Sequence, residues 1–367
     1  GHVFYEDFLF SSKYLEGAIL TFLRRSGRVA PNKPKRMHKN DDGSDGESKF
    51  VGAYVKQPKP GLYKWVYDLD LTSLYPSIIM SINISPETKV GKIEDWDAQK
   101  FIKGEVAEYR VGDNYITKDN LQKLLEKSKY SIASNGVMYR TDKPGCIPDI
   151  LDLWFSQRVE FRKLEKKYGD EGDKEKYAFY KKRQLVQKIL LNSLYGVLGL
   201  PAFRFYDVDN ATAVTTTGQT VIKSTADMAN IKYNKELNTP NADSNIYIDT
   251  DSVFFSAVPL LDHRKPNWKN EEQDVIAGYV NEIAGEMQDY LNNFYDILGK
   301  KVFNIDKHRF EIKKEYVSKS GIWIAKKRYA QWIISDNGVP VDRLDVKGLD
   351  VVRSSYPAAF RTFMGEV

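Results

Sequence analysis

Two acidic residues close together in the chain have the spacing to bind a cation. Asp249 and Asp251 flank Thr250 within residues 245–255, where the pattern predicts a strand, a tight turn and a second strand. Because residues i and i+2 of an extended chain point to the same side, we expect the two carboxylates to lie together. Such a pair repels unless a cation lies beside it. An ordinary polar hairpin turn would show the same pattern, so both interpretations stay open at this point.

A second acidic pair stands far upstream, at the end of another predicted strand. Residues 64–71 alternate between apolar and polar positions, and Asp68 and Asp70 lie near the end of this segment. One of these carboxylates beside Asp251 would form an oxygen-only site of the kind that Mg²⁺ prefers. Pro76 then predicts the start of a helix, because the first helical turn tolerates a missing N–H group.

A basic helical hairpin is the third candidate site. Residues 150–168 and 174–198 predict two long helices joined by a short loop. Between residues 158 and 188, eleven Lys and Arg residues stand against six Asp and Glu residues. This excess of five equals the net charge of +5 for the whole chain, so the positive charge is concentrated on the hairpin.

The side chains of this hairpin have a spacing that suits a nucleotide. Arg158 and Arg162 are four residues apart on the first helix. Lys188, Asn192 and Tyr195 share one face of the second helix. Three cations from two helices would bind a triphosphate through charge-assisted hydrogen bonds. The alternative is a solvated helix surface with ordinary salt bridges.

Other predicted elements must position these groups. They are helices over residues 118–129, 210–237 and 271–298, and short strands over residues 309–351. Asn337-Gly338 indicates a hairpin turn within the last segment. Residues 31–49 are rich in Pro, Gly, Ser and charge and predict a linker, whereas residues 89–117 show no clear pattern.

The composition excludes several classes of protein. Of the 367 residues, 42% are hydrophobic and 29% charged, which indicates a folded chain rather than a disordered one. The single cysteine, Cys146, excludes a disulfide framework and a cysteine zinc site, and it suggests a reducing compartment. The histidines show no metal spacing. We find no run of apolar residues long enough to span a bilayer and no signal-peptide pattern at the N-terminus, so we expect no membrane association.

Three segments occur in an order that resembles the polymerase motifs of family B DNA polymerases. They are Asp70-Leu-Thr-Ser-Leu-Tyr-Pro-Ser77, Lys188-Ile-Leu-Leu-Asn-Ser-Leu-Tyr-Gly196 and Tyr247-Ile-Asp-Thr-Asp-Ser252. Lesser matches are Gly52-Ala53, Lys326-Lys-Arg-Tyr329 and Lys347-Gly348. Asn83-Ile-Ser-Pro-Glu-Thr88, and Ser354-Ser355 with Pro357, are similar to the replicative polymerases of T-even-like tailed phages. The resemblance covers about residues 50–357.

This resemblance implies template-directed DNA synthesis in viral DNA replication, in the cytoplasm of an infected bacterial host. Deoxynucleotides would be added to a primer 3′-hydroxyl with release of pyrophosphate. The implied fold is α+β, a polymerase palm of antiparallel sheet and packed helices with an inserted helical-hairpin fingers subdomain. The expected parts are residues 1–60 as an N-terminal remnant and linker, 61–149 as the first part of the palm, 150–198 as the fingers, and 199–367 as the second part of the palm, ending at the thumb junction.

The resemblance also implies a metal site. Asp70 and Asp251 match the two metal-binding carboxylates, and the backbone carbonyl of Leu71 would add a ligand. Asp249 would be a supporting catalytic carboxylate. The ions would be two Mg²⁺, for which Mn²⁺ can substitute, lying about 3.5–4 Å apart for an in-line displacement.

The other acids have different expected roles. Glu315 fits a further family acid near the metals, whereas Asp68 matches no family acid and is expected to be structural. Exonuclease chemistry in the family needs an Asp-x-Glu segment on a buried strand. Asp45-Gly-Glu47 and Asp173-Lys-Glu175 lie instead in polar loops, so we expect both to be solvated.

Several residues match nucleotide-binding positions of the family. Arg158, Arg162 and Lys188 would bind the β- and γ-phosphates, and Lys188 would also donate a proton to pyrophosphate. Many relatives carry Lys where this chain has Arg162, and Arg replaces a point donor with a planar fork. Tyr75 resembles a steric gate that excludes a 2′-hydroxyl, with a core tyrosine as the alternative. The remaining expected nucleotide-binding residues are Leu71, Ser73, Leu74, Asn192 and Tyr195.

The implied partners are deoxynucleoside triphosphates and primer–template DNA. The expected DNA-binding residues are Gly196, Lys326, Lys327, Arg328, Tyr329 and Lys347. An exonuclease domain and a thumb would come from missing sequence or a partner chain, and a sliding clamp is a further candidate partner. Two rival hypotheses stay open: a non-catalytic DNA-binding or assembly subunit of a split polymerase, and a protein-primed family B enzyme.

Overall fold

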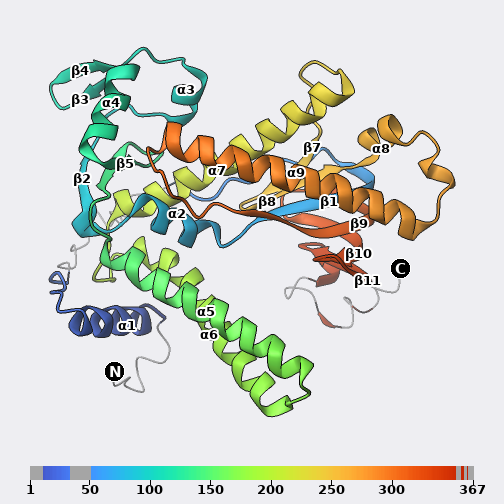
Figure 1. Ribbon diagram of the computed structural model, residues 1–367, viewed down its shortest axis with the longest axis horizontal. Helices are drawn as coiled ribbons and strands as arrows, with labels where there is room; N and C mark the ends of the chain where they lie inside the picture. The colour runs from blue at the N-terminus through green and yellow to red at the C-terminus, as the bar shows by residue number, and fades with distance from the viewer. Residues whose placement is uncertain (1–10, 34–50, 353–356, 359–361, 363–367) are drawn as a thin grey trace. The chain divides into compact units, whose positions relative to one another are not determined.

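The computed structural model describes residues 11–33, 51–352, 357, 358 and 362 (Figure 1). Most of the predicted linker, Asp45-Gly-Glu47 and Ser354-Ser355 lie outside these residues. The described chain combines helices with antiparallel strands, which confirms the α+β class. It divides into two compact units. The helical unit comprises Gly1–Gly52, Ser73–Thr217 and Leu298–Arg309, and the sheet unit comprises Ala53–Thr72, Gly218–Ile297 and Phe310–Val367.

A six-stranded antiparallel sheet forms the frame of the sheet unit within the described residues, in the order β11-β10-β9-β1-β8-β7. The strands are β1 (Gly61–Leu71), β7 (Asn245–Asp249), β8 (Ser252–Ser256), β9 (Ile312–Ala325), β10 (Arg328–Asp336) and β11 (Val339–Lys347). The predicted turn at Asn337-Gly338 joins β10 to β11, and both residues have positive φ, as this turn requires. The predicted strands over residues 64–71 and 245–255 are also confirmed.

Helices pack on this sheet. The sheet unit contains α8 (Val258–Arg264) and the larger parts of α7 (Val208–Leu237) and α9 (Gln273–Val302), because the unit boundaries fall inside the two long helices. The hydroxyls of Tyr67 on β1 and Tyr233 on α7 are 2.9 Å apart, and both side chains are buried. Thr225 of α7 meets the hydroxyl of Tyr295 on α9 at 2.8 Å. Buried, hydrogen-bonded tyrosines therefore connect β1 and the two helices.

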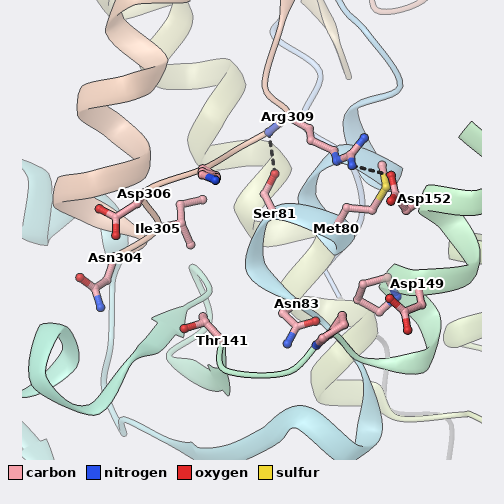
Figure 2. A pocket seen from close by; sticks show the side chains of 13 residues that line it. Met80, Ser81, Asn83, Thr141, Asp149, Asp152, Asn304, Ile305, Asp306 and Arg309 are labelled. Carbon is pink, nitrogen blue, oxygen red and sulfur yellow. Dashed lines mark hydrogen bonds and ion pairs between the residues drawn. The ribbon is translucent and has the colours of Figure 1, made fainter. Parts of the chain in front are cut away.

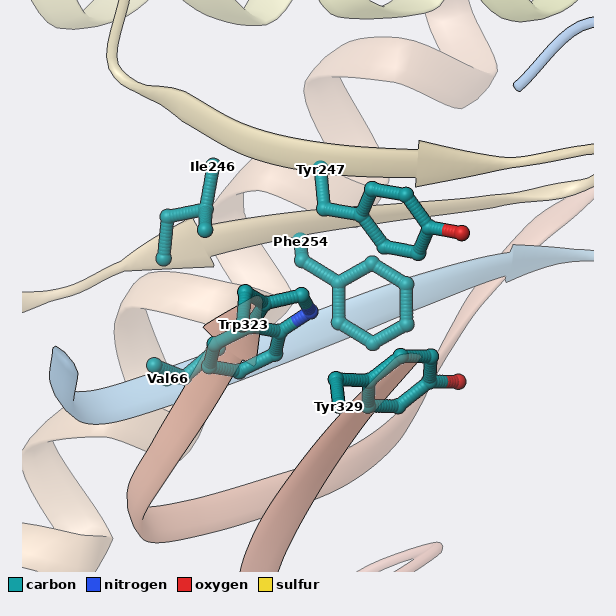
Figure 3. Packing of buried hydrophobic residues seen from close by; sticks show 6 residues of the cluster. All are labelled: Val66, Ile246, Tyr247, Phe254, Trp323 and Tyr329. Atoms are coloured by element: carbon teal, nitrogen blue, oxygen red, sulfur yellow. The ribbon is translucent and has the colours of Figure 1, made fainter. Parts of the chain in front are cut away.

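Side chains from the strands of this sheet, most of them aromatic, pack together in a buried cluster (Figure 3). Trp323 of β9 and Tyr329 of β10 stack with ring centroids 5.8 Å apart, and Phe254 of β8 lies against both rings. Large buried aromatic side chains contribute strongly to stability, because each removes a large apolar area from water. The cluster comprises Val66, Ile246, Tyr247, Phe254, Trp323 and Tyr329.

The helical unit is built from short sheets and longer helices. Its helices are α1 (Ser11–Arg25), α2 (Leu74–Ile82), α3 (Ala98–Lys103), α4 (Lys118–Ser128), α5 (Cys146–Asp170) and α6 (Lys174–Leu198), with the first residues of α7. Its strands are β2 (Lys89–Lys92), β3 (Glu108–Val111), β4 (Asn114–Thr117), β5 (Tyr130–Ile132) and β6 (Val137–Arg140). Residues 89–117 showed no pattern because these strands, four residues each, are too short for a visible alternation.

Helices α5 and α6 form the predicted hairpin, seen in green in Figure 1. Tyr168 and Tyr180 stack across it at 5.5 Å, and Gln187 donates a hydrogen bond to Gln157 at 2.8 Å. Helix α5 begins at Cys146, four residues earlier than predicted, because Pro148 lies in its first turn. In the part of the chain that the structure describes, no helix has both the length and the apolar character to cross a membrane.

Candidate active site

The turn between β7 and β8 brings Asp249 and Asp251 together. Asp249 ends β7, Thr250 adopts a left-handed conformation with φ of 61°, and the Asp251 amide donates a hydrogen bond to the Asp249 carbonyl at 2.7 Å. The prediction that these acids are close was based on extended alternation. The predicted tight turn is present, but Thr250 within it is left-handed, so alternation along an extended chain does not describe this segment.

Strand pairing places Asp70 beside this turn. Asp70 lies opposite Ser252 in the β1–β8 register, and the Ser252 hydroxyl donates to the Asp70 carboxylate at 2.7 Å. The next residue, Leu71, donates its amide to the Asp251 carbonyl at 2.9 Å. Hydrogen bonds at Asp70 and at the next residue, Leu71, therefore connect the end of β1 to the β7–β8 turn and the start of β8.

The electrostatics of this acidic cluster favour a cation. Burial raises the pKa of Asp251 to about 6, and the negative charges of Asp249 and Glu315 add to the rise, while Lys327 opposes it. Asp249 itself is paired with Lys327, with Nζ and a carboxylate oxygen 2.5 Å apart. The negative charge of an ionised Asp251 is thus poorly balanced by positive charge of the protein. A divalent cation would relieve its repulsion from Asp249 and Glu315.

The donor set fits Mg²⁺ in chemistry. Among the described residues, no group of three or more His, Cys, Asp and Glu side chains could by itself hold a metal ion. Mg²⁺ keeps several waters and is commonly bound through one or two carboxylates and substrate phosphates. Asp70 and Asp251, with the Leu71 carbonyl, supply oxygen donors only, so the residues present fit this ion.

The β9–β10 hairpin presents cations beside the acids. Lys326 and Lys327 form its tip, and the Lys327 amide donates to the Tyr247 hydroxyl at 2.7 Å. Gly348 lies against this tip: a Cβ atom there would be 1.9 Å from the Lys327 carbonyl oxygen, and Gly348 has φ of +62°. Only glycine permits this close approach, which explains the Lys347-Gly348 segment after β11.

The other expected DNA-binding residues, on β10 and β11, differ in exposure. Lys347 is exposed and lies 3.2 Å from Asp345, and Arg328 pairs with Asp350 at 3.6 Å. Tyr329 is only 7% exposed and belongs to the aromatic cluster. A DNA contact at this hairpin would therefore rest on its cations, while Tyr329 supports the strands beneath them.

In the helical unit, the expected gate residue contacts an expected base-pair residue. The rings of Tyr75 on α2 and Tyr195 on α6 are 4.3 Å apart. Ser73 precedes α2 in a left-handed conformation, with φ of 49°, and its carbonyl accepts from the Ser77 amide. Leu74 is buried, so its side chain is part of the core. Two residues predicted to act on one nucleotide thus meet across a helix pair.

The cations of the α5–α6 hairpin include an unsatisfied donor. Within the described residues, the half-buried Arg158 has no hydrogen-bond partner for its Nε atom. Burial and the neighbouring Arg162 lower the pKa of Arg158. Lys188 and Asn192 are exposed on α6. Since a buried cation is costly without a counter-charge, Arg158 fits the binding of an anion.

A comparison with known families identifies the chain. The family model described as DNA polymerase family B matches residues 10–263. The chain belongs to DNA polymerase family B. It is 28% identical to the DNA-directed DNA polymerase of Escherichia phage RB69, over 86% of this chain and 40% of that protein. It is also 28% identical to the DNA-directed DNA polymerase of Enterobacteria phage T4, over 91% of this chain and 42% of that protein.

Relatives of this family B chain extend beyond phages. The DNA polymerase of Thermococcus gorgonarius is 27% identical over 89% of this chain and 32% of that protein. The chain spans about 40% of the length of the two phage relatives. The family resemblance indicated by the three sequence motifs is therefore confirmed. The chain corresponds to only part of each phage polymerase.

The helical unit of this family B chain also contains a pocket of about 510 Å³, lined by residues outside the candidate site (Figure 2). None of the predicted site residues lines it. Its acid Asp152 pairs with Arg309 at 2.5 Å, and its acid Asp149 pairs with Arg28. Both acids are therefore already neutralised by partners within the protein.

Three contacts of the candidate site in this family B chain were not predicted from the sequence. The hydroxyl of Ser252 holds Asp70, the hydroxyl of Tyr247 holds the Lys327 amide, and Lys327 pairs with Asp249. Ser252 and Tyr247 both lie within the matched segment at 247–252, which was the available signal. Their partners lie 182 and 80 residues away, so spacing along the chain could not reveal the pairs.

Proposed function

We propose that this chain carries the nucleotidyl-transfer site of a DNA-directed DNA polymerase. It would add deoxynucleotides to a primer 3′-hydroxyl under the direction of a template and release pyrophosphate. The observation that carries the proposal is the pairing of β1 with β8, which sets Asp70 opposite Ser252, the residue after the partly buried Asp251, in a cluster whose like charges a cation would relieve. Membership in family B supports it independently.

The acids of the sheet unit would bind the metal ions. Asp70 and Asp251 would hold two divalent ions, Mg²⁺ or Mn²⁺, with the Leu71 carbonyl as a further ligand. When bound, such ions lower the pKa of the attacking hydroxyl and stabilise charge on the phosphoryl oxygens. Ser252 orients the Asp70 carboxylate, and Asp249 fixes Lys327, so both interactions position groups before substrate arrives.

The cations of the helical unit would bind the incoming triphosphate. Arg158, Arg162 and Lys188 would contact its β- and γ-phosphates, since charge-assisted hydrogen bonds to phosphate are the strong ones. Lys188 would also donate a proton to the leaving pyrophosphate. Tyr75, held against Tyr195, would exclude a ribose 2′-hydroxyl by overlap.

The remaining proposed contacts to nucleotide and DNA involve residues at the protein surface. Asn192 is exposed, and a Cβ atom at Gly196 would meet no neighbour within 4 Å, so the surface there is open to a base. Lys326, Lys327 and Lys347 would contact the duplex backbone. Phosphate contacts are independent of sequence, as a polymerase requires.

We also propose the setting of this activity. The two phage relatives support a role in viral DNA replication in the cytoplasm of an infected bacterium. We propose residues 61–149 and 199–367 as a palm and residues 150–198 as fingers. An exonuclease domain, a thumb and a sliding clamp are proposed partners, whether they belong to further sequence or to other chains.

Primer extension tests the proposal directly. The chain is incubated with a labelled DNA primer–template, deoxynucleoside triphosphates and Mg²⁺, and product length is followed on a gel. We expect distributive extension that stops when Mg²⁺ is chelated. Duplex binding without any extension would support a non-catalytic subunit instead. Extension that starts only from a protein hydroxyl would support a protein-primed enzyme.

A further inference from the structure

The strand that carries Glu315 is irregular beside the acidic cluster. In the β1–β9 register, Tyr67 pairs with Val317 and Leu69 pairs with Lys314. Between these pairs, β9 contributes two residues, Glu315 and Tyr316, whereas β1 contributes Asp68 alone. This is a β-bulge, in which two residues of one strand oppose one residue of its partner.

The side chain of Asp68 compensates for this bulge. A bulge leaves a backbone group without its partner in the ladder. Here the Tyr316 amide donates to a carboxyl oxygen of Asp68 at 2.6 Å. Asp68 is only 4% exposed, and a buried polar group in the middle of a sheet is costly unless it is hydrogen-bonded. The bulge and the buried acid therefore satisfy each other.

Neighbouring contacts hold both ends of the bulged segment. The Lys314 amide donates to the Gln288 side chain of α9 at 2.9 Å, and the Glu315 carbonyl accepts from the Asn337 amide at 2.7 Å. Bulges occur next to active sites, where they change the direction of a side chain. In the same register Asp70 pairs with Lys313, so Glu315 lies two residues along β9 from the partner of a proposed metal ligand.

We propose that Asp68 is a positioning residue, which holds the Glu315–Tyr316 bulge and thereby directs the Glu315 carboxylate toward the metal-binding acids. This inference rests on the proposed function of the acidic cluster. It revises the sequence expectation for Asp68, a structural acid outside the site. This role requires a hydrogen-bond acceptor at position 68 but does not require a negative charge. An amide oxygen should therefore serve as well as the carboxyl oxygen.

The test compares two variants of Asp68 in the absence of DNA and nucleotide. Asp68→Leu removes the acceptor at similar size, and Asp68→Asn keeps it. Mn²⁺ alone is titrated into the chain, and binding is followed by electron paramagnetic resonance. We expect about tenfold weaker Mn²⁺ binding for Asp68→Leu, since losing a group that orients metal ligands costs about 10–100-fold in affinity. Asp68→Asn should stay within about twofold of the unchanged chain.

Amide hydrogen exchange supplies a second readout at the bulge itself. The Tyr316 amide should exchange at least about tenfold faster in Asp68→Leu and at the ordinary rate in Asp68→Asn, because only the former loses its acceptor. Ser318→Ala is the matched control. Ser318 lies on β9 outside the bulge, and its replacement removes a buried hydrogen bond to Gln331 of β10. If Asp68→Leu does not fold, Asp68→Ala removes the same acceptor with a smaller side chain.

The outcomes separate this inference from the proposed function. Weaker Mn²⁺ binding in Asp68→Leu, rescued in Asp68→Asn and absent in Ser318→Ala, supports the positioning role. Unchanged Mn²⁺ binding in a folded Asp68→Leu or Asp68→Ala overturns it, even when the unchanged chain binds Mn²⁺ and extends primers. If the unchanged chain does neither, the proposed function fails first, and this inference fails with it.

Discussion

The acidic cluster and the basic hairpin differ in what holds their functional groups in place. Asp70 and Asp251 come from strands far apart in the chain, and hydrogen bonds between those strands set their positions. Arg158, Arg162 and Lys188 stand on two helices that are adjacent in the chain. The acids depend on long-range pairing, whereas the cations depend on helical spacing and a short loop.

The acids of the cluster and the cations of the hairpin also differ in solvent exposure. Asp251 is partly buried, and this burial raises its pKa to about 6, while Lys188 and Arg162 are exposed. A buried, preorganised group acts strongly on charge that develops during reaction. An exposed cation acts mainly on the affinity for a charged ligand. We therefore expect substitutions in the acidic cluster to lower kcat, and substitutions in the hairpin to raise KM.

Loss of a proposed metal-binding acid should give the largest effect. Asp251→Ala or Asp70→Ala should slow nucleotide addition by about 1,000-fold or more, because a metal ion supplies several kcal/mol of transition-state stabilisation. Duplex binding, measured by fluorescence anisotropy, should change little. Asp113→Ala, an exposed acid in the β3–β4 turn, is the control. Normal extension by either variant would refute the metal assignment.

The proposed gate should affect substrate choice with little change in metal binding. Tyr75→Ala should raise ribonucleotide incorporation by about 10–200-fold, the range in which a pocket discriminates by shape. Tyr75→Phe keeps the ring and should behave like the unchanged chain. Single-nucleotide insertion with matched ribo- and deoxynucleotides provides the measurement. Equal discrimination in all three proteins would remove Tyr75 from the gate role.

Loss of a hairpin cation should act on affinity. Arg158→Ala should raise KM for the nucleotide by about 10–100-fold, since a hydrogen bond to a charged group contributes about 1.5–3 kcal/mol. Lys188→Ala should raise KM and also lower kcat, because it loses a proton donor. Lys182→Ala is the control, since it lies six residues from Lys188 and on another face of α6. A pure kcat effect for Arg158→Ala would contradict the contrast between the two regions.

The close approach at Gly348 should appear as lost stability. Gly348→Ala should lower the free energy of unfolding by about 2 kcal/mol or more, because a left-handed alanine costs about 1–2 kcal/mol and its Cβ would also strike the Lys327 carbonyl. Gly338→Ala has positive φ but open space, so it should cost only about 1–2 kcal/mol. Urea unfolding measures both. Equal losses would show that the Lys327 tip moves aside freely.

The smallest expected effect comes from the N-terminus of α5, the first helix of the basic hairpin. Glu87 accepts hydrogen bonds from Ser85 and from the Cys146 amide, the first residue of α5. Burial opposes ionisation of Glu87, but these hydrogen bonds outweigh it, so its pKa is lowered from 4.5. A lowered carboxyl pKa stabilises the fold above the ordinary pKa, and this stability is lost as pH falls through the lowered value.

Glu87→Gln should therefore cost about 1 kcal/mol of unfolding free energy at pH 7, the usual value of a helix cap. The difference from the unchanged chain should shrink in acid. Glu108→Gln, an exposed glutamate on β3, should show no such difference at any pH. Thermal unfolding at a series of pH values provides the measurement. A loss for Glu87→Gln that is constant with pH would argue against an ionised cap.

Local features of this protein were predictable from its sequence. The hairpin of α5 and α6, the strand and turn that carry Asp249 and Asp251, and the turn at Asn337-Gly338 all appear where periodicity and turn residues indicate them. The order of three motifs was enough to indicate the family. Such signals are visible because helices, turns and short motifs depend on residues within one or two turns of each other.

Only the tertiary structure decided how distant residues meet. The contact of Ser252 with Asp70 spans 182 residues, and that of Asp68 with the Tyr316 amide spans 248. The alternation of a strand identifies its two faces but not its neighbour or its register. Tyr329, matched as a DNA contact, is buried because its strand pairs with β9 and faces Phe254. Register and burial arise from long-range pairing, so the sequence determined the chemical groups and the fold determined which of them act together.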